Sequence, residues 1–174
     1  TLLLWLALPV VMIRLGWRAL SSSRYRGRIS ERFGGGALDN RCCDLWIHAV
    51  SVGEVKAATP LVQRLLKEKK HLNIIITTMT PTGAQQVVDT FGKEVRHRFA
   101  PYDYPFAIRR FINQFSPRLL ILMETEIWPN MIRICHQQGI AVSMANVRLS
   151  ARSARGYRFV LPLVRDGLSK VSLF

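Results

Sequence analysis

Short apolar runs alternate with helical patterns from residue 45 onward, and this alternation restricts the possible folds more than any other feature of the chain. The elements follow one another as strand 45–50, helix 54–70, strand 73–78, helix 83–91, strand 118–123, helix 128–138 and strand 140–144. Short strands that alternate with helices are typical of βαβ units, in which helices cover both faces of a mostly parallel sheet. The sequence therefore predicts an α/β fold with a Rossmann-like domain at residues 45–174.

The chain before residue 45 begins with an apolar segment. Residues 2–13 form an unbroken apolar run, and as a helix this run reaches only about 18 Å of a roughly 30 Å hydrocarbon layer. If the helix continues to residue 20, with the charged groups of Arg14 and Arg18 at the headgroups, residues 1–20 become a hydrophobic membrane-anchor helix. A buried amphipathic helix that belongs to the domain itself is the alternative.

A basic flank follows the apolar segment. Six arginines lie between Arg14 and Arg32, with only Glu31 opposing them. The positive-inside rule keeps such a flank cytoplasmic, so the folded domain should face the cytosol. Residues 33–40 are rich in glycine and turn formers, and we expect residues 21–44 to be a basic flank and Gly-rich linker.

The charge and the absent motifs narrow the possible functions. Lysines and arginines number 25 against 11 aspartates and glutamates, and the net charge of +14 indicates an anionic partner such as nucleic acid, a membrane surface or a phosphorylated substrate. Neither a GxGxxG fingerprint nor a P-loop occurs. The three cysteines and four histidines lack metal-ligand spacing, so we predict no metal site.

The junction after the first strand is a candidate site. The carboxyl ends of strands border the ligand crevice in open α/β sheets, and Ser51, Gly53 and Glu54 follow the strand at 45–50. Gly53 permits a tight turn, and Glu54 lies beside the unpaired N–H groups of a helix N-terminus. The alternative is that Glu54 only stabilises the first helical turn, by a few tenths to about 1 kcal/mol.

Two later junctions carry further polar residues. Thr80 and Thr82 belong to a threonine cluster at 77–83 that could hold an anion or a sugar hydroxyl, although helix capping explains one or two of these threonines. Glu124 and Glu126 end an apolar strand, and they share a face only if the strand persists that far. Acidic residues at two adjacent strand ends favour a base with an electrostatic helper.

The tail from residue 146 is basic and rich in hydroxyl groups. It contains Arg148 and Arg152. A phosphate-binding loop and a solvated surface segment explain this composition equally well.

Five ordered motifs give the chain a family resemblance. They are HAVSVGE at 48–54, TTMTPTG at 77–83, PYDYP at 101–105, METEIWPN at 123–130 and ANVRLSARSARGY at 145–157. Together they resemble the transferases that add 3-deoxy-D-manno-octulosonic acid (Kdo) to the lipid A precursor. The similarity covers essentially the whole chain.

The resemblance implies a GT-B glycosyltransferase of two Rossmann-like halves, of which this chain is similar to the N-terminal, acceptor-binding half. The family moves Kdo from CMP-Kdo to the lipid A precursor (lipid IVA) in lipopolysaccharide biosynthesis, by inversion and without a metal or other cofactor. The reaction takes place at the cytoplasmic face of the cell inner membrane. CMP-Kdo binds mainly to the C-terminal donor domain, which is absent here, so we expect this fragment alone to be inactive.

The matched motifs also imply residue roles. Glu54 corresponds to the proton acceptor and Glu124 to a transition-state stabiliser. Weaker substrate-binding candidates are Ser51, Gly53, Thr80, Thr82, Asn130, Arg148 and Arg152.

Two other interpretations start from the basic charge. A non-catalytic module could use the basic flank to bind an anionic membrane surface. Nucleic-acid binding is disfavoured by the acidic strand ends and by the lack of aromatic residues interleaved with a basic stripe.

Overall fold

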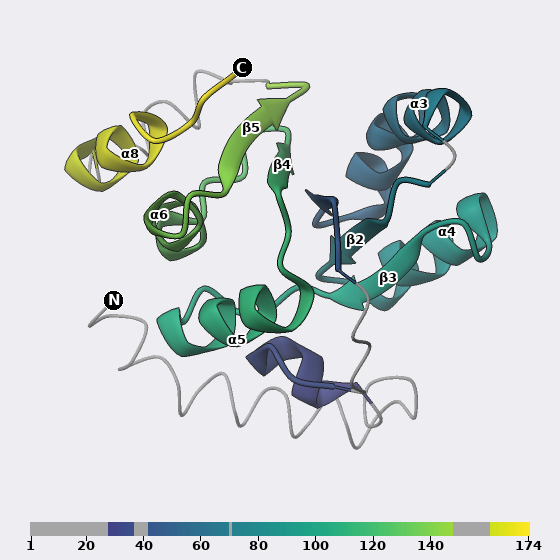
Figure 1. Cartoon of the computed structure of the whole chain (residues 1–174), viewed down its shortest axis with the longest axis horizontal. Helices are drawn as coiled ribbons and strands as arrows, with labels where there is room; N and C mark the ends of the chain where they lie inside the picture. Colours follow the sequence, from purple (N-terminus) through teal and green to yellow (C-terminus); the bar gives the residue numbers. More distant parts are fainter. Residues whose placement is uncertain (1–27, 37–41, 70, 148–160) are drawn as a thin grey trace.

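The computed structural model describes residues 28–36, 42–69, 71–147 and 161–174, and it contains a parallel sheet flanked by helices (Figure 1). The strands are β1 (Leu45–His48), β2 (Ile74–Thr78), β3 (Arg96–Phe99), β4 (Leu119–Met123) and β5 (Ala141–Ala145). The helices are the 3-10 helix η1 (Ile29–Phe33), α3 (Val52–Glu68), α4 (Pro81–Phe91), α5 (Pro105–Phe115), α6 (Pro129–Gln137) and α8 (Leu161–Leu168). The predicted α/β, Rossmann-like class is confirmed.

The strand order places the candidate site. The sheet has the order β3-β2-β1-β4-β5, and every neighbouring pair is parallel. The chain builds outward from β1 to β3 and then returns to the other side of β1 with β4, so the order reverses between β1 and β4. Ligands of open α/β sheets bind outside the carboxyl ends of the strands at such a reversal.

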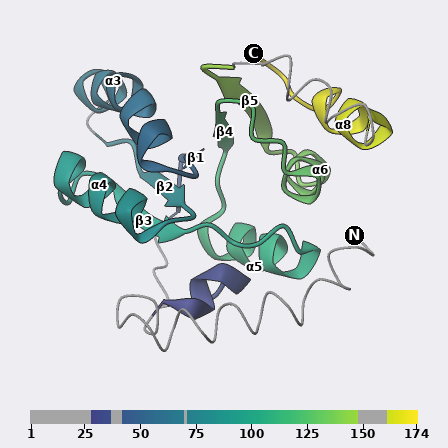
Figure 2. The same ribbon diagram turned by 180° about the vertical axis from the view of Figure 1, so that it is seen from behind.

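Two apolar cores cover the two faces of the sheet. Trp46 packs with residues of α5 and α6 on one face, and its neighbour Ile47 packs with residues of α3 and α4 on the other. Figure 2 shows these two helix pairs on opposite sides of the sheet. Successive strand residues point to opposite faces, which is why an unbroken apolar run is needed in a strand covered on both sides.

Residues 28–36 pack as part of the domain, so our interpretation of 21–44 as flank and linker is wrong for them. Glu31 and Arg32 of η1 are buried. Gly34 has φ 72°, and a Cβ at this position would lie 2.1 Å from the carbonyl oxygen of Ala107 in α5. Only glycine fits so close to another backbone. Residues 37–41 of the predicted linker lie outside the described residues.

β3 is absent from the strands that the sequence predicts. Its residues RHRF include three half-buried polar side chains and one buried phenylalanine, so no apolar run marks the strand. The backbone N–H of Phe99 donates to Glu31 Oε2 at 2.7 Å, and Arg28 Nη2 donates to the carbonyl oxygen of His97 at 3.1 Å. Polar contacts with η1 thus stabilise this edge strand.

No helix in the described part of the chain is long and apolar enough to cross a membrane. The predicted membrane anchor at residues 1–20 lies outside the described residues, so it stays a prediction.

Candidate active site

Glu54 lies in the first turn of α3, directly after β1. Its backbone N–H donates to Ser51 Oγ, the N-cap, at 3.4 Å. Its carboxylate in turn accepts the backbone N–H of Val50 at 2.8 Å and the hydroxyl of Ser51 at 3.1 Å. This arrangement resembles a capping box, except that the carboxylate accepts the N–H of Val50 and the hydroxyl of Ser51 instead of the N–H of the N-cap residue. The side chain is therefore held on the strand end, with the residue only 5% exposed.

The surroundings of Glu54 favour proton uptake. Burial raises the pKa of this carboxyl above its ordinary value, the hydrogen bonds from Val50 and Ser51 oppose that rise, and the carboxylates of Glu126 and Glu124 add to it. A carboxylate with a raised pKa is a stronger base than an exposed one, provided that it remains ionised at the working pH. The sequence left two roles open for Glu54, helix stabilisation and base chemistry, and this geometry permits both.

Glu124 and Glu126, the acidic residues after β4, do not have strand geometry. β4 ends at Met123, so Glu124 and Glu126 do not continue its alternation. Glu124 has φ 57°, a left-handed conformation rare for a residue with a side chain, and its N–H donates to the carbonyl oxygen of Ala145 at 2.8 Å. Glu126 Oε2 accepts the indole N–H of Trp128 at 2.9 Å. Backbone strain of this kind clusters at functional sites.

The threonine loop caps α4. Thr80 is the N-cap, and its Oγ1 accepts the backbone N–H of Gly83 at 3.0 Å. A Cβ on Gly83 would lie 3.0 Å from that same oxygen, so a side chain at this position would crowd the N-cap. Thr82 is exposed, and its hydroxyl donates to Thr80 Oγ1 at 3.3 Å. Capping accounts for Thr80, whereas the exposed Thr82 is open to a ligand.

The loop between β3 and α5, which contains most of the PYDYP motif but no predicted site residue, is joined to α6 by Asp103. Its carboxylate accepts the backbone N–H groups of Asn130 at 3.0 Å and Met131 at 2.8 Å. The side-chain amide of Asn130 donates back to the carbonyl oxygen of Asp103 at 2.7 Å and accepts Arg133 Nη2 at 3.1 Å. Asn130, predicted as a substrate-binding residue, is buried and joins the first turn of α6 to the loop that contains Asp103.

Asp103 provides a pH-dependent test of this junction. Burial raises its pKa from 3.8 to about 6, against the opposing hydrogen bonds from Asn130 and Met131. Because the folded pKa exceeds the unfolded one, the stabilising contribution of this titration is complete below pH 3.8 and is lost as the pH rises through about 6. The free energy of unfolding of the wild type, minus that of Asp103→Asn, should therefore fall across this window in urea titrations. A difference that rises with pH would show that the amide hydrogen bonds outweigh burial.

His48 lies under the site as a neutral group. It is fully buried, and burial lowers its pKa to about 3. Its Nδ1 is 3.0 Å from Thr77 Oγ1, which also accepts the indole N–H of Trp46 at 2.8 Å. The imidazole ring meets the Trp128 ring edge-on at 4.8 Å between centroids. These contacts join the ends of β1 and β2 to Trp128.

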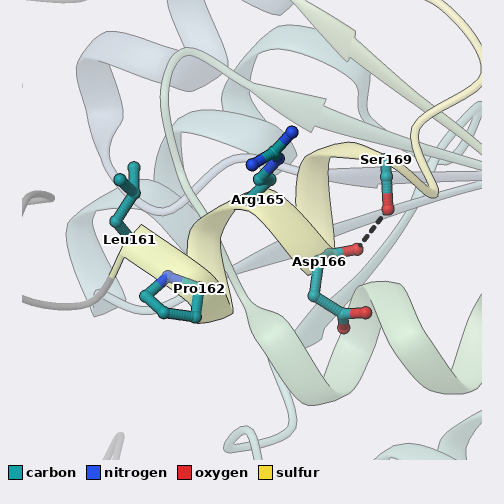
Figure 3. A pocket seen from close by; sticks show the side chains of 5 residues that line it. All are labelled: Leu161, Pro162, Arg165, Asp166 and Ser169. Carbon is teal, nitrogen blue, oxygen red and sulfur yellow. Dashed lines mark hydrogen bonds between the residues drawn. The ribbon is translucent and has the colours of Figure 1, made fainter.

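Three predicted substrate-binding residues remain. Gly53 is exposed in the first turn of α3, and Arg148 and Arg152 lie outside the described residues. Among the residues that the structure describes, no group of three or more His, Cys, Asp or Glu is arranged to hold a metal ion. Figure 3 shows a surface hollow on and just after α8. None of its lining residues is a predicted site residue; they are Leu161, Pro162, Arg165, Asp166 and Ser169.

The structure thus brings two acidic junctions to one edge of the sheet. Glu54 follows β1 and Glu124 follows β4, and these strands are paired in parallel register where the strand order reverses. A carboxylate that is buried and held by two hydrogen bonds can take a proton from a hydroxyl brought within about 2.6–3.2 Å. A second acidic region beside it can act on charge that develops in the transition state.

Comparisons with known proteins agree with the motifs. A family model described as 3-Deoxy-D-manno-octulosonic-acid transferase (kdotransferase) matches residues 27–174. The chain is 45% identical to a 3-deoxy-D-manno-octulosonic acid transferase of Haemophilus influenzae over 99% of its own length and 41% of that relative. A probable mitochondrial enzyme of the same name from Arabidopsis thaliana is 36% identical over 95% of the chain and 38% of the relative. The Bordetella pertussis transferase is 34% identical over 88% of the chain and 35% of the relative. The chain therefore spans about two fifths of the length of these curated relatives.

Proposed function

The chain belongs to the 3-deoxy-D-manno-octulosonic acid transferase family, and we propose that it forms the acceptor-binding half of a GT-B enzyme that transfers Kdo from CMP-Kdo to the lipid A precursor, lipid IVA. The observation that carries this proposal is the buried carboxylate of Glu54 at the carboxyl end of β1. It lies next to the strand-order reversal, where an α/β sheet binds its ligands.

In the proposed reaction, Glu54 accepts the proton of the attacking sugar hydroxyl while that oxygen bonds to the anomeric carbon of Kdo. The bond between this carbon and the phosphate oxygen of CMP breaks, CMP leaves with the bonding electron pair, and attack from the opposite face inverts the anomeric centre. Hydrogen bonds from Val50 and Ser51 keep the Glu54 carboxylate in place during the transfer. Glu124 acts on the charge that develops in the transition state.

The net charge and the exposed Thr82 support binding of a phosphorylated acceptor. The net charge of +14 suits an acceptor that carries phosphate groups, which arginine can bind in bidentate fashion. Thr82, exposed at the start of α4, is available for a sugar hydroxyl or a phosphate oxygen. Arg148 and Arg152 stay proposed phosphate ligands.

The direct test uses the full-length protein with CMP-Kdo and lipid IVA. Mass spectrometry of the lipid should show a mass increase of one or more Kdo units, and the rate should be the same with EDTA because the proposed mechanism needs no metal. The isolated 174 residues should give no transfer, since CMP-Kdo is proposed to bind mainly to the other half. Transfer by this fragment, or no transfer by the full-length protein, would contradict the proposal.

We also propose that the protein acts at the cytoplasmic face of the inner membrane. Arg28 and Arg32 are bound within the domain, to Glu31 and Met79, so we expect Arg14, Arg18, Arg24 and Arg26 to attract anionic lipid. Each basic residue near an anionic surface contributes about 1 kcal/mol, and this attraction weakens with salt, whereas apolar insertion does not.

Deleting residues 1–17 should therefore leave a peripheral association that salt reverses. The measurement is co-sedimentation with phosphatidylglycerol vesicles at low and high salt, and neutral vesicles serve as the control. The variant Arg64→Ala removes an exposed arginine of α3 and should bind like the wild type. Binding of the truncated protein that withstands high salt would show that another surface inserts.

A further inference from the structure

Arg32, which we predicted to be part of the basic flank, lies inside the domain. Arg32 of η1 is 2% exposed. Its guanidinium carbon is 4.3 Å from the ring centroid of Phe99 and 5.7 Å from that of Tyr102. The backbone N–H of Tyr102 also donates to the carbonyl oxygen of Arg32 at 2.8 Å. The side chain is thus fixed by stacking on two rings, a geometry that favours arginine over lysine.

The guanidinium ends on the loop between β2 and α4. Arg32 Nη2 donates to the carbonyl oxygen of Met79 at 2.7 Å, and Nη1 is 3.1 Å from Met79 Sδ. Met79 immediately precedes Thr80, the N-cap of α4. Arg32 therefore holds the loop that brings the threonine cluster to the edge of the sheet.

From Met79, two more hydrogen bonds lead to Glu54. The N–H of Met79 donates to the carbonyl oxygen of Val50 at 3.0 Å, and the N–H of Val50 donates to Glu54 Oε2 at 2.8 Å. Three consecutive contacts thus connect a buried cation on η1 with the carboxylate that is proposed to take the proton. Hydrogen bonds to charged groups are stronger than neutral ones and fix geometry more tightly.

We propose that Arg32 is a positioning residue for Glu54, and that it acts through the backbone of Met79 and Val50. The inference rests on the proposed function, because it concerns the base of that reaction. Arg32 touches neither acceptor nor donor in this mechanism. Its effect on the rate comes from holding the β2–α4 loop against the β1–α3 loop, so that the carboxylate meets the acceptor hydroxyl at the correct distance.

Removing the guanidinium should lower kcat more than it changes KM. In the full-length protein, Arg32→Met keeps an unbranched side chain between the rings but cannot donate to Met79. A misplacement of about 1 Å at a reacting group can reduce a rate by up to roughly 100-fold, so we expect kcat to fall about 10- to 100-fold while the KM for lipid IVA changes little. Arg32→Lys keeps a charged donor and should recover part of the loss.

Arg28 supplies a matched control. It lies just before η1, its guanidinium carbon is 4.6 Å from the same Phe99 ring, and its hydrogen bonds go to Glu31 and His97. Arg28→Met removes a comparable cation from the same region without removing the contact to Met79. It should reduce kcat much less than Arg32→Met. Equal losses of kcat in the two variants would show a general loosening of η1 and overturn the inference.

Hydrogen exchange tests the positioning without reference to activity. In full-length Arg32→Met, exchange in peptides that cover residues 49–54 and 76–80 should accelerate, whereas peptides from β4 should keep their protection. In Arg28→Met, residues 49–54 should remain protected. Equal acceleration in every peptide, or none at 49–54 in Arg32→Met, would overturn the inference.

The two measurements separate this inference from the proposed function. If the wild type transfers Kdo and Glu54→Gln abolishes transfer, a normal kcat in Arg32→Met contradicts the role of Arg32 alone. If Glu54→Gln keeps its rate, the proposed role of Glu54 fails, and the exchange of residues 49–54 still decides whether Arg32 holds this loop.

Discussion

Glu54→Gln should lower kcat of the full-length protein by about 10²–10⁴-fold, the usual contribution of a positioned general base. The attacking sugar hydroxyl is a poor nucleophile at neutral pH, and glutamine cannot take its proton. The amide oxygen can still accept the N–H of Val50, and the amide nitrogen can face the hydroxyl oxygen of Ser51. Folding should therefore be nearly unaffected, with a loss of less than about 1 kcal/mol from the helix-end charge.

The measurement is the steady-state rate of Kdo transfer together with the thermal midpoint. Glu68→Gln is a matched control, because Glu68 is an exposed carboxylate at the other end of α3, paired with Arg64 at 2.8 Å. Its kcat should equal that of the wild type. A near-normal kcat in Glu54→Gln would reject the base and leave Glu54 as a first-turn stabiliser. The wild-type rate should also decline as the pH falls through the raised pKa of Glu54, since only the ionised carboxylate accepts a proton.

Glu124→Gln is expected to slow transfer by about 10²–10³-fold, the loss typical of removing one electrostatic stabiliser of a transition state. Glu124→Gly should slow transfer at least as much, and its stability should also show the effect of the left-handed backbone at this position. The left-handed φ of 57° strains any residue with a Cβ, whereas glycine adopts it freely and gains entropy in the unfolded chain. These effects oppose each other, so the free energy of unfolding should change by no more than about 1 kcal/mol.

Ser116→Gly is the matched control for this prediction. Ser116 also has a left-handed backbone, φ 45°, but it is the C-cap of α5. Its replacement makes the same kind of backbone change without removing a carboxylate, so kcat should stay at the wild-type value. A fully active Glu124→Gly would show that this residue shapes the turn after β4 and contributes no charge to the reaction.

Position along the chain was enough to make Glu54 a candidate site residue. Its strand is apolar, a helix pattern follows at once, and the carboxyl ends of parallel strands share one edge of a sheet. The structure confirms that Glu54 lies in the first turn of α3, and it shows that Ser51 is the N-cap. The helix predicted at 128–138 is α6, which begins at Pro129, a place where the missing N–H of proline is no disadvantage.

The elements that the sequence analysis did not assign differ from that pattern. β3 carries half-buried polar residues because it is an edge strand covered by η1 instead of an apolar core. We predicted Gly34 to be part of a linker, because glycine is also common in linkers. Only the approach of α5 shows that this glycine is needed for packing.

The sequence by itself determined the alternation of strands and helices, the two acidic junctions and the family motifs. These features are local, because the spacing of apolar residues within a short segment indicates whether that segment is a buried strand or a helix. The tertiary structure alone decided that Arg32 reaches Met79, that the Asp103 carboxylate accepts N–H groups at the start of α6 and that the Asn130 side chain donates to the Asp103 loop. Such contacts join residues 27 to 47 positions apart. They leave no periodic signal, because the partner of a buried polar group depends on which loops the sheet order brings together.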